Sequence, residues 1–136
     1  MGRKYARESS MKLLYQMEIN SDFSNGTISQ FFENNSFNES EREYIEGSIY
    51  TIIDNLKDID SNIKDNISGW KLHRLARVDL CILRIAIYEI IFRDDIPVEV
   101  SINEAIEISK KYSTDESSKF INGVLGGFVR SRDKDE

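Results

Sequence analysis

The sequence predicts an all-α protein, and three features of its 136 residues support this fold class. Apolar residues recur at intervals of three or four along most of the chain, which is the spacing of one helix face. No segment shows the sustained alternation of apolar and polar residues that is typical of a half-buried strand. Proline, which interrupts helices, occurs once, at Pro97. The length suits one compact domain over residues 1–136 with a core of its own.

The N-terminal region predicts two helices joined by a loop. The first has small and apolar side chains at helical spacing, at Ala6, Ser10, Leu13, Leu14 and Met17. Residues 20–26 combine Asn, Ser, Asp and Gly, a composition that predicts a loop. A short helix over about residues 27–34 follows, and its apolar stripe consists of Ile28, Phe31 and Phe32.

The acidic middle region predicts a long amphipathic helix. Asn38 precedes Glu41 by three residues, which is the pattern of a capping box at a helix start. Apolar residues then continue at helical spacing as far as Ile67. We expect one long helix, or two nearly collinear helices broken near Asp60 and Ser61. The acidic residues fall mainly between the apolar positions and indicate a solvated face, not metal ligands.

Residues 78–92 predict the central, buried helix, because nearly every side chain in this stretch is apolar. A helix that is apolar on most of its faces is surrounded by other elements. A buried parallel strand also gives a continuous apolar run, but the length of this one favours a helix. Before it, Ser68 and Gly69 end the preceding helix, and residues 70–77 form an amphipathic, basic stretch.

The C-terminal region predicts a turn over residues 93–97 and two further helices. Each helix is preceded by a capping-box pattern, Ser101 to Glu104 and Ser113 to Glu116. The charged segment that begins at Arg130 is expected to fray, and the tail from about residue 131 to be flexible.

Charge and composition restrict the class of protein. The net charge of −6 argues against a general nucleic-acid coat protein. Positive charge nevertheless gathers in residues 1–20, 69–93 and 119–136, and acidic stretches separate these segments. If the two ends of the chain meet in space, an acidic protein gains one basic face. The alternative is a mixed-charge surface whose charge simply varies along the chain.

Three further observations bear on location. No apolar run approaches the roughly 20 residues that a membrane-spanning helix needs. The first residues are charged and lack the apolar stretch of a signal peptide. The single cysteine, Cys81, excludes an internal disulfide. These features predict a cytoplasmic protein that does not bind membranes.

A catalytic site finds no support in the sequence. His73 is the only histidine, and Cys81 lies in the most apolar segment, where a reactive thiolate is disfavoured. One Cys and one His eight residues apart form neither a zinc site nor a convincing nucleophile pair. Gly126 and Gly127 lie late in a predicted helix that no strand precedes, so they do not form a phosphate-binding loop. We therefore expect no enzymatic activity, no metal and no cofactor.

A nucleic-acid interface is better supported. The cations Arg3, Lys4 and Arg7 cluster within five residues around Tyr5. Cations with an interleaved aromatic ring suit single-stranded nucleic acid, because charge follows the phosphates and the ring stacks on a base. Many N-termini are basic, however, so this motif alone is a weak signal.

The last predicted helix adds a second cation–aromatic pair, Lys119 and Phe120. If Lys119 faces the first helix, the two pairs form one patch, and Asn122 adds a hydrogen-bonding group beside it. Core packing is an equally good interpretation of Phe120. Asn122 and Gly123 would let the last helix approach the first closely, which would bring the pairs together. The sequence does not indicate a role for Gly126 and Gly127.

Four segments, in order along residues 3–125, resemble the NusB family of transcription antitermination factors. They are Arg3-Lys4-Tyr5-Ala6-Arg7-Glu8 with Leu14-Tyr15; Val78-Asp79 leading to Ile82-Leu83-Arg84-Ile85-Ala86 and Tyr88-Glu89; Pro97 followed by Ile102-Asn103-Glu104-Ala105-Ile106-Glu107-Ile108; and Ser117-Ser118-Lys119-Phe120-Ile121-Asn122-Gly123-Val124-Leu125. The last two segments are specific to the family. The arginine run at the N-terminus is shorter than in many members, and Lys4 lacks the bidentate fork of arginine.

The resemblance implies a fold of about seven helices in two small packed bundles. It also implies binding of a single-stranded RNA element, boxA, in ribosomal leader transcripts, together with NusE, a small-subunit ribosomal protein. The complex travels with the RNA polymerase elongation complex and suppresses premature termination. Some members of the family form homodimers that cover the RNA face, and the residues here leave the oligomeric state open.

By motif position, the resemblance also assigns residues. The RNA-binding residues would be Arg3, Lys4, Arg7, Tyr15, Glu116, Lys119, Phe120 and Asn122. Asp79 and the exposed side of the helix from Val78 would meet the NusE-like partner.

Two alternatives remain at this point. One is a helical protein-interaction adaptor without RNA binding of its own, which the acidic composition and the short basic motif allow. The other is the RNA-guiding domain of an RNA methyltransferase, although the chain is too short to hold a cofactor-binding domain as well.

Overall fold

The computed structural model describes residues 2–69 and 71–135, with side chains up to Asp133. This part of the chain forms seven α-helices and one short 3-10 helix, η1, and contains no strand. The elements are α1 (Arg3–Asn20), α2 (Asn25–Asn34), α3 (Glu39–Asp54), α4 (Leu56–Lys64), η1 (Leu72–Arg74), α5 (Arg77–Phe92), α6 (Val98–Tyr112) and α7 (Asp115–Asp135). The predicted all-α class is confirmed.

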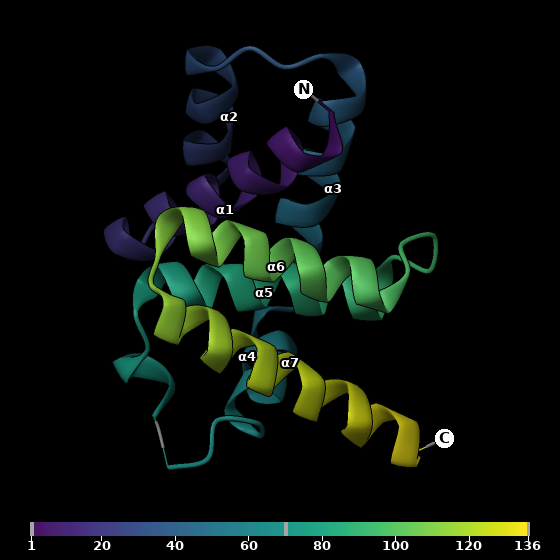
Figure 1. Cartoon of the computed structure of the whole chain (residues 1–136). Helices are drawn as coiled ribbons and strands as arrows, with labels where there is room; N and C mark the ends of the chain where they lie inside the picture. Colours follow the sequence, from purple (N-terminus) through teal and green to yellow (C-terminus); the bar gives the residue numbers. More distant parts are fainter. Residues whose placement is uncertain (1, 70, 136) are drawn as a thin grey trace.

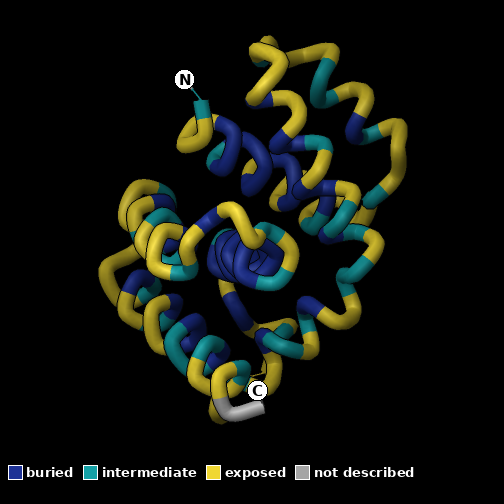
Figure 2. Tube along the Cα trace, turned by 90° about the vertical axis from the view of Figure 1, so that its right-hand side faces the viewer, coloured by how far each residue is buried: buried dark blue, intermediate teal, exposed yellow. Residues whose placement is uncertain are grey.

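The helices form two groups that share α5 (Figure 1). In the N-terminal group α1 packs against α3, and α2 lies beside α1; in the C-terminal group α6 packs against α7, and α4 also contacts α7. Helix α5 contacts α1, α3, α4, α6 and α7. Figure 2 looks along α5 and shows it as a buried helix ringed by the others.

The sequence of α5 explains its central place. Every residue from Asp79 to Ile90 is buried, including four isoleucines and two leucines. Full burial of one such side chain contributes about 1.5–3 kcal/mol relative to leaving it in water. The outer helices are amphipathic and turn their apolar stripes, such as Ile45, Ile49 and Ile52 of α3, toward the shared core. The predicted central helix is therefore confirmed.

The break in the long middle helix lies at Asn55, not near Asp60 and Ser61 as expected. Asn55 leaves the helical conformation, with φ −121° and ψ 21°, and its side-chain amide donates to the carbonyl of Thr51 at 2.9 Å. Asparagine interrupts helices because its side chain competes for backbone hydrogen bonds. Asp60 instead lies within α4, where its carboxylate accepts two 2.8 Å hydrogen bonds from Arg84 of α5.

Helix starts follow the predicted capping patterns in part. Asn38 and Glu41 form the expected capping box at α3, with reciprocal hydrogen bonds of 2.8 and 2.9 Å. Helix α2 begins at Asn25, two residues earlier than expected, because Ser24 caps it through the amide of Thr27.

The other two capping boxes are wrong. Helix α6 begins directly after Pro97, so Ser101 lies inside the helix and donates to Glu89 at 2.8 Å. At α7 the capping oxygen belongs to Thr114, which accepts from the amide of Ser117 at 3.0 Å. Pro97 suits the position directly before α6, because its fixed φ fits a helix start and its missing N–H is not needed there.

Helix α7 is continuous to Asp135, through the segment that was expected to fray, and its glycines have different surroundings. A methyl group at Gly123 would meet no atom within 4 Å, so Gly123 does not provide a close approach to α1. A methyl group at Gly127 would lie 3.0 Å from the side-chain oxygen of Asn66, next to the end of α4. The close approach thus occurs at Gly127, which had received no assignment.

We predict that Gly123→Ala stabilises the protein by roughly 0.5–1 kcal/mol, because alanine is the better helix former and the methyl group meets open space. Gly127→Ala should stabilise the protein less than Gly123→Ala does, or destabilise it, because the new methyl group pushes against Asn66. Urea unfolding followed by circular dichroism measures both free energies of unfolding. The matched control is Gly127→Ala combined with Asn66→Ala, which should recover stability relative to Asn66→Ala alone. Equal gains in the free energy of unfolding at positions 123 and 127 would contradict the close approach at Gly127.

Candidate nucleic-acid interface

The predicted RNA-binding residues lie mainly at the starts of two helices that α6 separates. Arg3, Lys4 and Arg7 occupy the beginning of α1, whereas Glu116, Lys119, Phe120 and Asn122 occupy the beginning of α7. Helix α6 lies between α1 and α7 (Figure 1) and packs against α5 and α7. A surface that includes both groups therefore crosses α6, and the expected direct approach of α7 to α1 is wrong.

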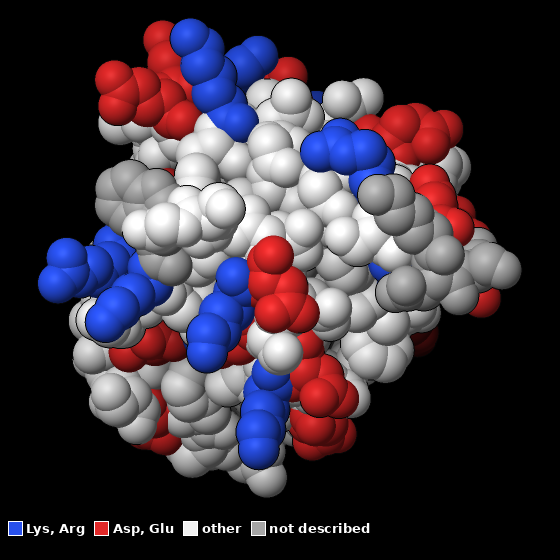
Figure 3. Space-filling model, turned by 90° about the horizontal axis from the view of Figure 1, so that it is seen from below, with Lys and Arg blue, Asp and Glu red and all other residues white. Residues whose placement is uncertain are grey.

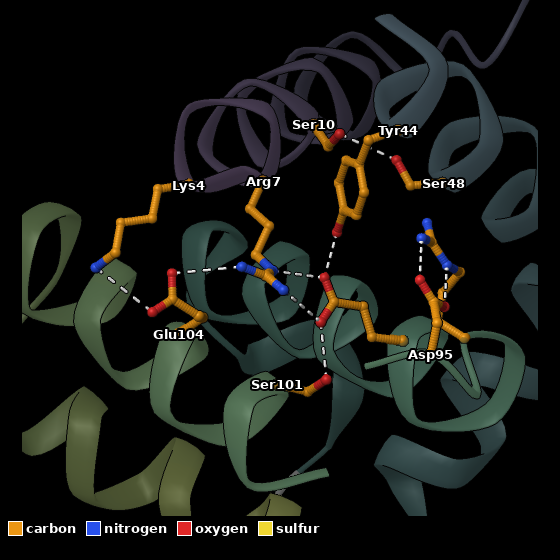
Figure 4. Close-up of polar contacts among 10 residues, drawn as sticks. Lys4, Arg7, Ser10, Tyr44, Ser48, Asp95, Ser101 and Glu104 are labelled. Atoms are coloured by element: carbon orange, nitrogen blue, oxygen red, sulfur yellow. Dashed lines mark hydrogen bonds and ion pairs between the residues drawn. The ribbon is translucent and has the colours of Figure 1, made fainter. Parts of the chain in front are cut away.

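Arg7 is a buried residue, with 5% of its surface exposed. Its Nε and Nη2 donate to the carboxylate of Glu89 at 2.6 and 3.3 Å, and its Nη1 donates to Glu104 at 3.4 Å (Figure 4). Burial by itself lowers the pKa of this guanidinium, but the hydrogen bond and charge of Glu89 raise it above its ordinary value. Arg7 is thus a permanent internal cation, and this geometry does not fit the expected contact with RNA phosphates.

Arg3 and Lys4 are the cations of this segment that a ligand can reach. The Lys4 side chain is 74% exposed, and its Nζ lies 3.5 Å from Glu104 Oε2. The guanidinium carbon of Arg3 lies 5.1 Å from the centre of the Tyr44 ring, in cation–π geometry. Both cations are therefore exposed, and each contacts a residue beneath it.

The surface along the boundary between α1 and α6 contains cations and an aromatic ring that the sequence had not singled out. The Nζ atoms of Lys12 and Lys111 lie 5.3 and 5.4 Å from the centre of the Tyr112 ring. A groove of about 360 Å³ runs beside them, lined by Lys4, Glu8, Glu104, Glu107, Ile108, Lys110 and Lys111. The run Lys110-Lys111-Tyr112 carries the same cation–aromatic signal as the N-terminus, so it was detectable in the sequence.

Carboxylates accompany these lysines. Glu8 accepts from Lys111 at 2.8 Å, and Glu104 pairs with Lys4. A phosphate that enters the groove would therefore replace a carboxylate as the partner of a lysine. This replacement lowers the net free energy gained from each lysine–phosphate contact. Tyr15 lies further along α1 and is 38% exposed, so its ring is accessible.

Asp79 is buried, whereas the resemblance implies that it contacts the protein partner. Its two carboxylate oxygens accept from the hydroxyl groups of Ser113 and Ser117 at 2.9 Å each. These bonds tie the start of α7 to the first turn of α5. Asp79 thus places the beginning of α7, and 6% of its surface is exposed.

Phe120 is half-buried and lies in a groove between α7 and the start of α5. The groove measures about 350 Å³ and is lined by Arg74, Leu75, Ala76, Asp79, Thr114, Glu116, Ser117 and Phe120. Phe120 also packs against the hydrophobic core, so both interpretations of this residue apply in part. Glu116, Lys119 and Asn122 are exposed on the same helix. Arg74 is a cation of this groove that the sequence analysis had not singled out.

Charges of both signs are interspersed elsewhere on the surface. Figure 3 views the molecule from below and shows lysine and arginine next to aspartate and glutamate around an uncharged area. This face gives no large single-sign field, so it lacks the electrostatic pattern of a general nucleic-acid coat.

Reactive groups are few in the described part of the chain. Burial raises the pKa of the Cys81 thiol to about 12, which keeps it protonated at neutral pH. Among residues 2–69 and 71–135, no group of three or more His, Cys, Asp and Glu side chains is arranged to hold a metal ion. No described helix combines the length and apolar character needed to cross a membrane.

Comparison with known proteins assigns a family. The profile of the NusB family matches residues 4–130. The chain is 48% identical over 130 residues to the transcription antitermination protein NusB of Acetivibrio thermocellus, covering 96% of this chain and 90% of the relative. It is also 48% identical over 129 residues to the NusB protein of Alkaliphilus oremlandii, covering 95% of this chain and 94% of the relative.

Solved structures agree with the sequence comparison. The structure of T. maritima NusB matches with a TM-score of 0.84 and 34% identity, over 96% of this chain and 93% of the other. A chain from a complex of NusB and NusE with double-stranded RNA matches with a TM-score of 0.85 and 26% identity, over 95% and 96% of the two chains. On these grounds the chain belongs to the NusB family of transcription antitermination proteins.

Proposed function

We propose that this protein binds a boxA-type single-stranded RNA element in ribosomal leader transcripts together with a NusE-like ribosomal protein. Bound to the RNA polymerase elongation complex, it suppresses premature termination. The observation that carries the proposal is the match, over nearly the whole chain, to a structure of NusB and NusE in complex with double-stranded RNA. The family match over residues 4–130 supports it.

The proposed RNA surface runs from the start of α1 across the end of α6 to the start of α7. Arg3 and Lys4 supply phosphate contacts at one end, and Lys119 supplies one at the other, with Glu116 and Asn122 beside it. Between them, the end of α6 adds Lys110 and Lys111, which lie along the groove next to α1. We call this surface the α1–α6–α7 surface. Its cations come from three segments that are far apart in the sequence, and together they can follow the phosphates of a single strand.

Aromatic side chains supply the second component of single-strand recognition. Phe120 presents part of its ring to the groove at the start of α7, where Arg74 is also exposed. Tyr15 offers an exposed ring on α1, and Tyr112 lies between the lysines of the two helices. Unpaired bases stack on such rings, whereas the bases inside a duplex are already stacked. This argument favours single-stranded RNA over double-stranded RNA.

The proposed partner surface is the exposed side of the helix from Val78, at the start of α5. Asp79 acts there by holding the beginning of α7 through Ser113 and Ser117, and not by direct contact. The same bonds place Phe120 relative to α5, so the partner and RNA surfaces adjoin. We propose in addition that the chain acts as one cytoplasmic domain, by binding alone and without catalysis.

The proposed function is tested by an electrophoretic mobility shift with labelled single-stranded boxA RNA, with and without the NusE-like protein. We expect a complex with the chain that becomes tighter when the partner is added. A scrambled RNA and the corresponding duplex are the controls and should bind more weakly. No shift in either condition would refute the RNA-binding proposal and leave a protein-interaction adaptor.

We predict that Arg3→Ala combined with Lys4→Ala weakens RNA binding and reduces its salt dependence. Each lost phosphate contact on single-stranded RNA lowers the log–log salt slope by about 0.7, so the double variant should lose about 1.4. Fluorescence anisotropy over a series of salt concentrations measures the slope. Lys57→Ala with Lys64→Ala removes equal charge from exposed positions of α4 and serves as the control. An equal loss of slope in both double variants would indicate long-range charge instead of local contacts.

We predict that Phe120→Leu lowers the affinity for single-stranded RNA, because leucine keeps apolar volume but cannot stack on a base. A base–aromatic stack is worth about 1–3 kcal/mol, which corresponds to roughly 5- to 150-fold in the dissociation constant. The matched control is Phe128→Leu, since Phe128 is 3% exposed in the core. That control should lower the melting temperature and leave RNA affinity unchanged. If Phe120→Leu lowers only the melting temperature, Phe120 belongs to the core alone.

A further inference from the structure

The carboxylate of Glu89 is the point at which four helices meet inside the protein. Glu89 lies on α5 and is 1% exposed. Besides two nitrogens of Arg7 from α1, it accepts the hydroxyl hydrogen of Tyr44 from α3 and that of Ser101 from α6, the latter at 2.8 Å. Figure 4 shows these three side chains converging from their separate helices. Four donors therefore satisfy one buried negative charge.

Two chains of contacts lead from this carboxylate to the exposed cations of α1. In the first, Arg7 bonds to Glu104 at 3.4 Å, and Glu104 pairs with Lys4 at 3.5 Å. In the second, the centre of the Tyr44 ring lies 5.1 Å from the guanidinium carbon of Arg3 and 5.7 Å from that of Arg93. Arg93 is itself fixed by two bonds to Asp95, at 2.7 and 2.8 Å. Each exposed cation thus rests on a residue that Glu89 or Arg7 holds.

The loss of the Glu89 charge would disturb both chains in a defined way. Arg7 stays charged, so it would require another anion, and Glu104 is the acidic partner already within reach. Glu104 would be drawn to Arg7 and away from Lys4. Tyr44 would lose the negatively charged acceptor of its hydroxyl group, which burial and the nearby Glu89 charge keep protonated by raising its pKa. Arg3 would then rest on a ring that is no longer fixed.

We propose that Glu89 is a positioning residue for RNA binding, which holds Arg3 and Lys4 in the arrangement that meets the phosphates. The proposal rests on the proposed function and adds to it a residue that lies inside the protein and contacts no RNA. Cations held in place before binding lose less conformational freedom when they bind. Without Glu89 the same charges remain on the surface, but RNA has to order them.

The test is Glu89→Gln, which keeps the size of the side chain and removes its charge. Ordering one long side chain on binding corresponds to roughly 2- to 12-fold in affinity, and we expect a loss in this range for each of the two cations. In the background of Arg3→Ala with Lys4→Ala, Glu89→Gln should cause no further loss. An equal loss in both backgrounds, or no loss in either, would overturn the proposal.

A matched control separates positioning from stability. Arg84 is as deeply buried as Arg7, with 4% of its side chain exposed against 6%, and it pairs with Asp60 through two 2.8 Å bonds. Asp60→Asn should therefore lower the melting temperature as Glu89→Gln does, while RNA affinity at a temperature where both variants are folded stays at the wild-type value. Equal losses of RNA affinity in the two variants would assign Glu89 a general role in stability.

Tyr44→Phe covers the case in which Glu89→Gln does not fold. It deletes one hydroxyl group, leaves Arg7 paired with Glu89, and keeps a ring beneath Arg3. RNA affinity should fall in the wild-type background and remain unchanged in the Arg3→Ala background. Equal effects in both backgrounds would contradict the contact chain through Tyr44.

Amide hydrogen exchange followed by mass spectrometry provides a readout that does not involve RNA. Glu89→Gln should accelerate exchange in the first turns of α1 more than Asp60→Asn does, because the carboxylate no longer holds Arg7. If wild-type protein binds no RNA, the proposed function fails, and this exchange experiment still tests whether Glu89 holds the start of α1. Unchanged exchange in α1 would overturn the positioning role.

Discussion

A helix that is buried on all sides cannot leave a charge without a partner, and α5 carries three charged residues in its buried stretch: Asp79, Arg84 and Glu89. An uncompensated charge in a protein interior costs several kcal/mol, so each must meet a complementary group from a neighbouring helix. Apolar packing alone would allow the outer helices to slide or rotate against the uniform surface of α5. The three charges restrict that freedom, since each is satisfied in one arrangement of its neighbours.

The three charges act at different places along α5. Asp79 binds Ser113 and Ser117 and fixes the start of α7. Arg84 binds Glu18 and Asp60 and joins the end of α1 to α4. Glu89 joins α1, α3 and α6 through Arg7, Tyr44 and Ser101. The described helices other than α2 are thus tied to α5 by at least one polar contact in addition to their apolar stripes.

This arrangement explains how two distant segments can contribute to the proposed α1–α6–α7 surface. The starts of α1 and α7 are not packed against each other; each is positioned from within, by Glu89 and by Asp79 at opposite ends of α5. Helix α6 fills the space between them and adds Lys110, Lys111 and Tyr112 to the surface. Carboxylates such as Glu8 and Glu104 lie among these cations, so the surface does not present a uniformly positive field to a polyanion.

The sequence by itself determined the helical class, the central place of residues 78–92 and the exposed cations at the N-terminus, because apolar spacing and charge are properties of local segments. It located Asn38 as a cap but misplaced the starts of α6 and α7, because Pro97 directly precedes α6 and Thr114 supplies the cap of α7. Ser101 and Ser113 instead donate to the buried carboxylates of Glu89 and Asp79. Only the tertiary structure decided that Arg7 and Asp79 lie inside, that Gly127 and not Gly123 is a point of close approach, and that Lys12 and Lys111 share the ring of Tyr112. Such facts depend on which helix lies beside which. That arrangement is set by the pairing of groups up to 97 positions apart, as between Arg7 and Glu104, and no local pattern records such pairs.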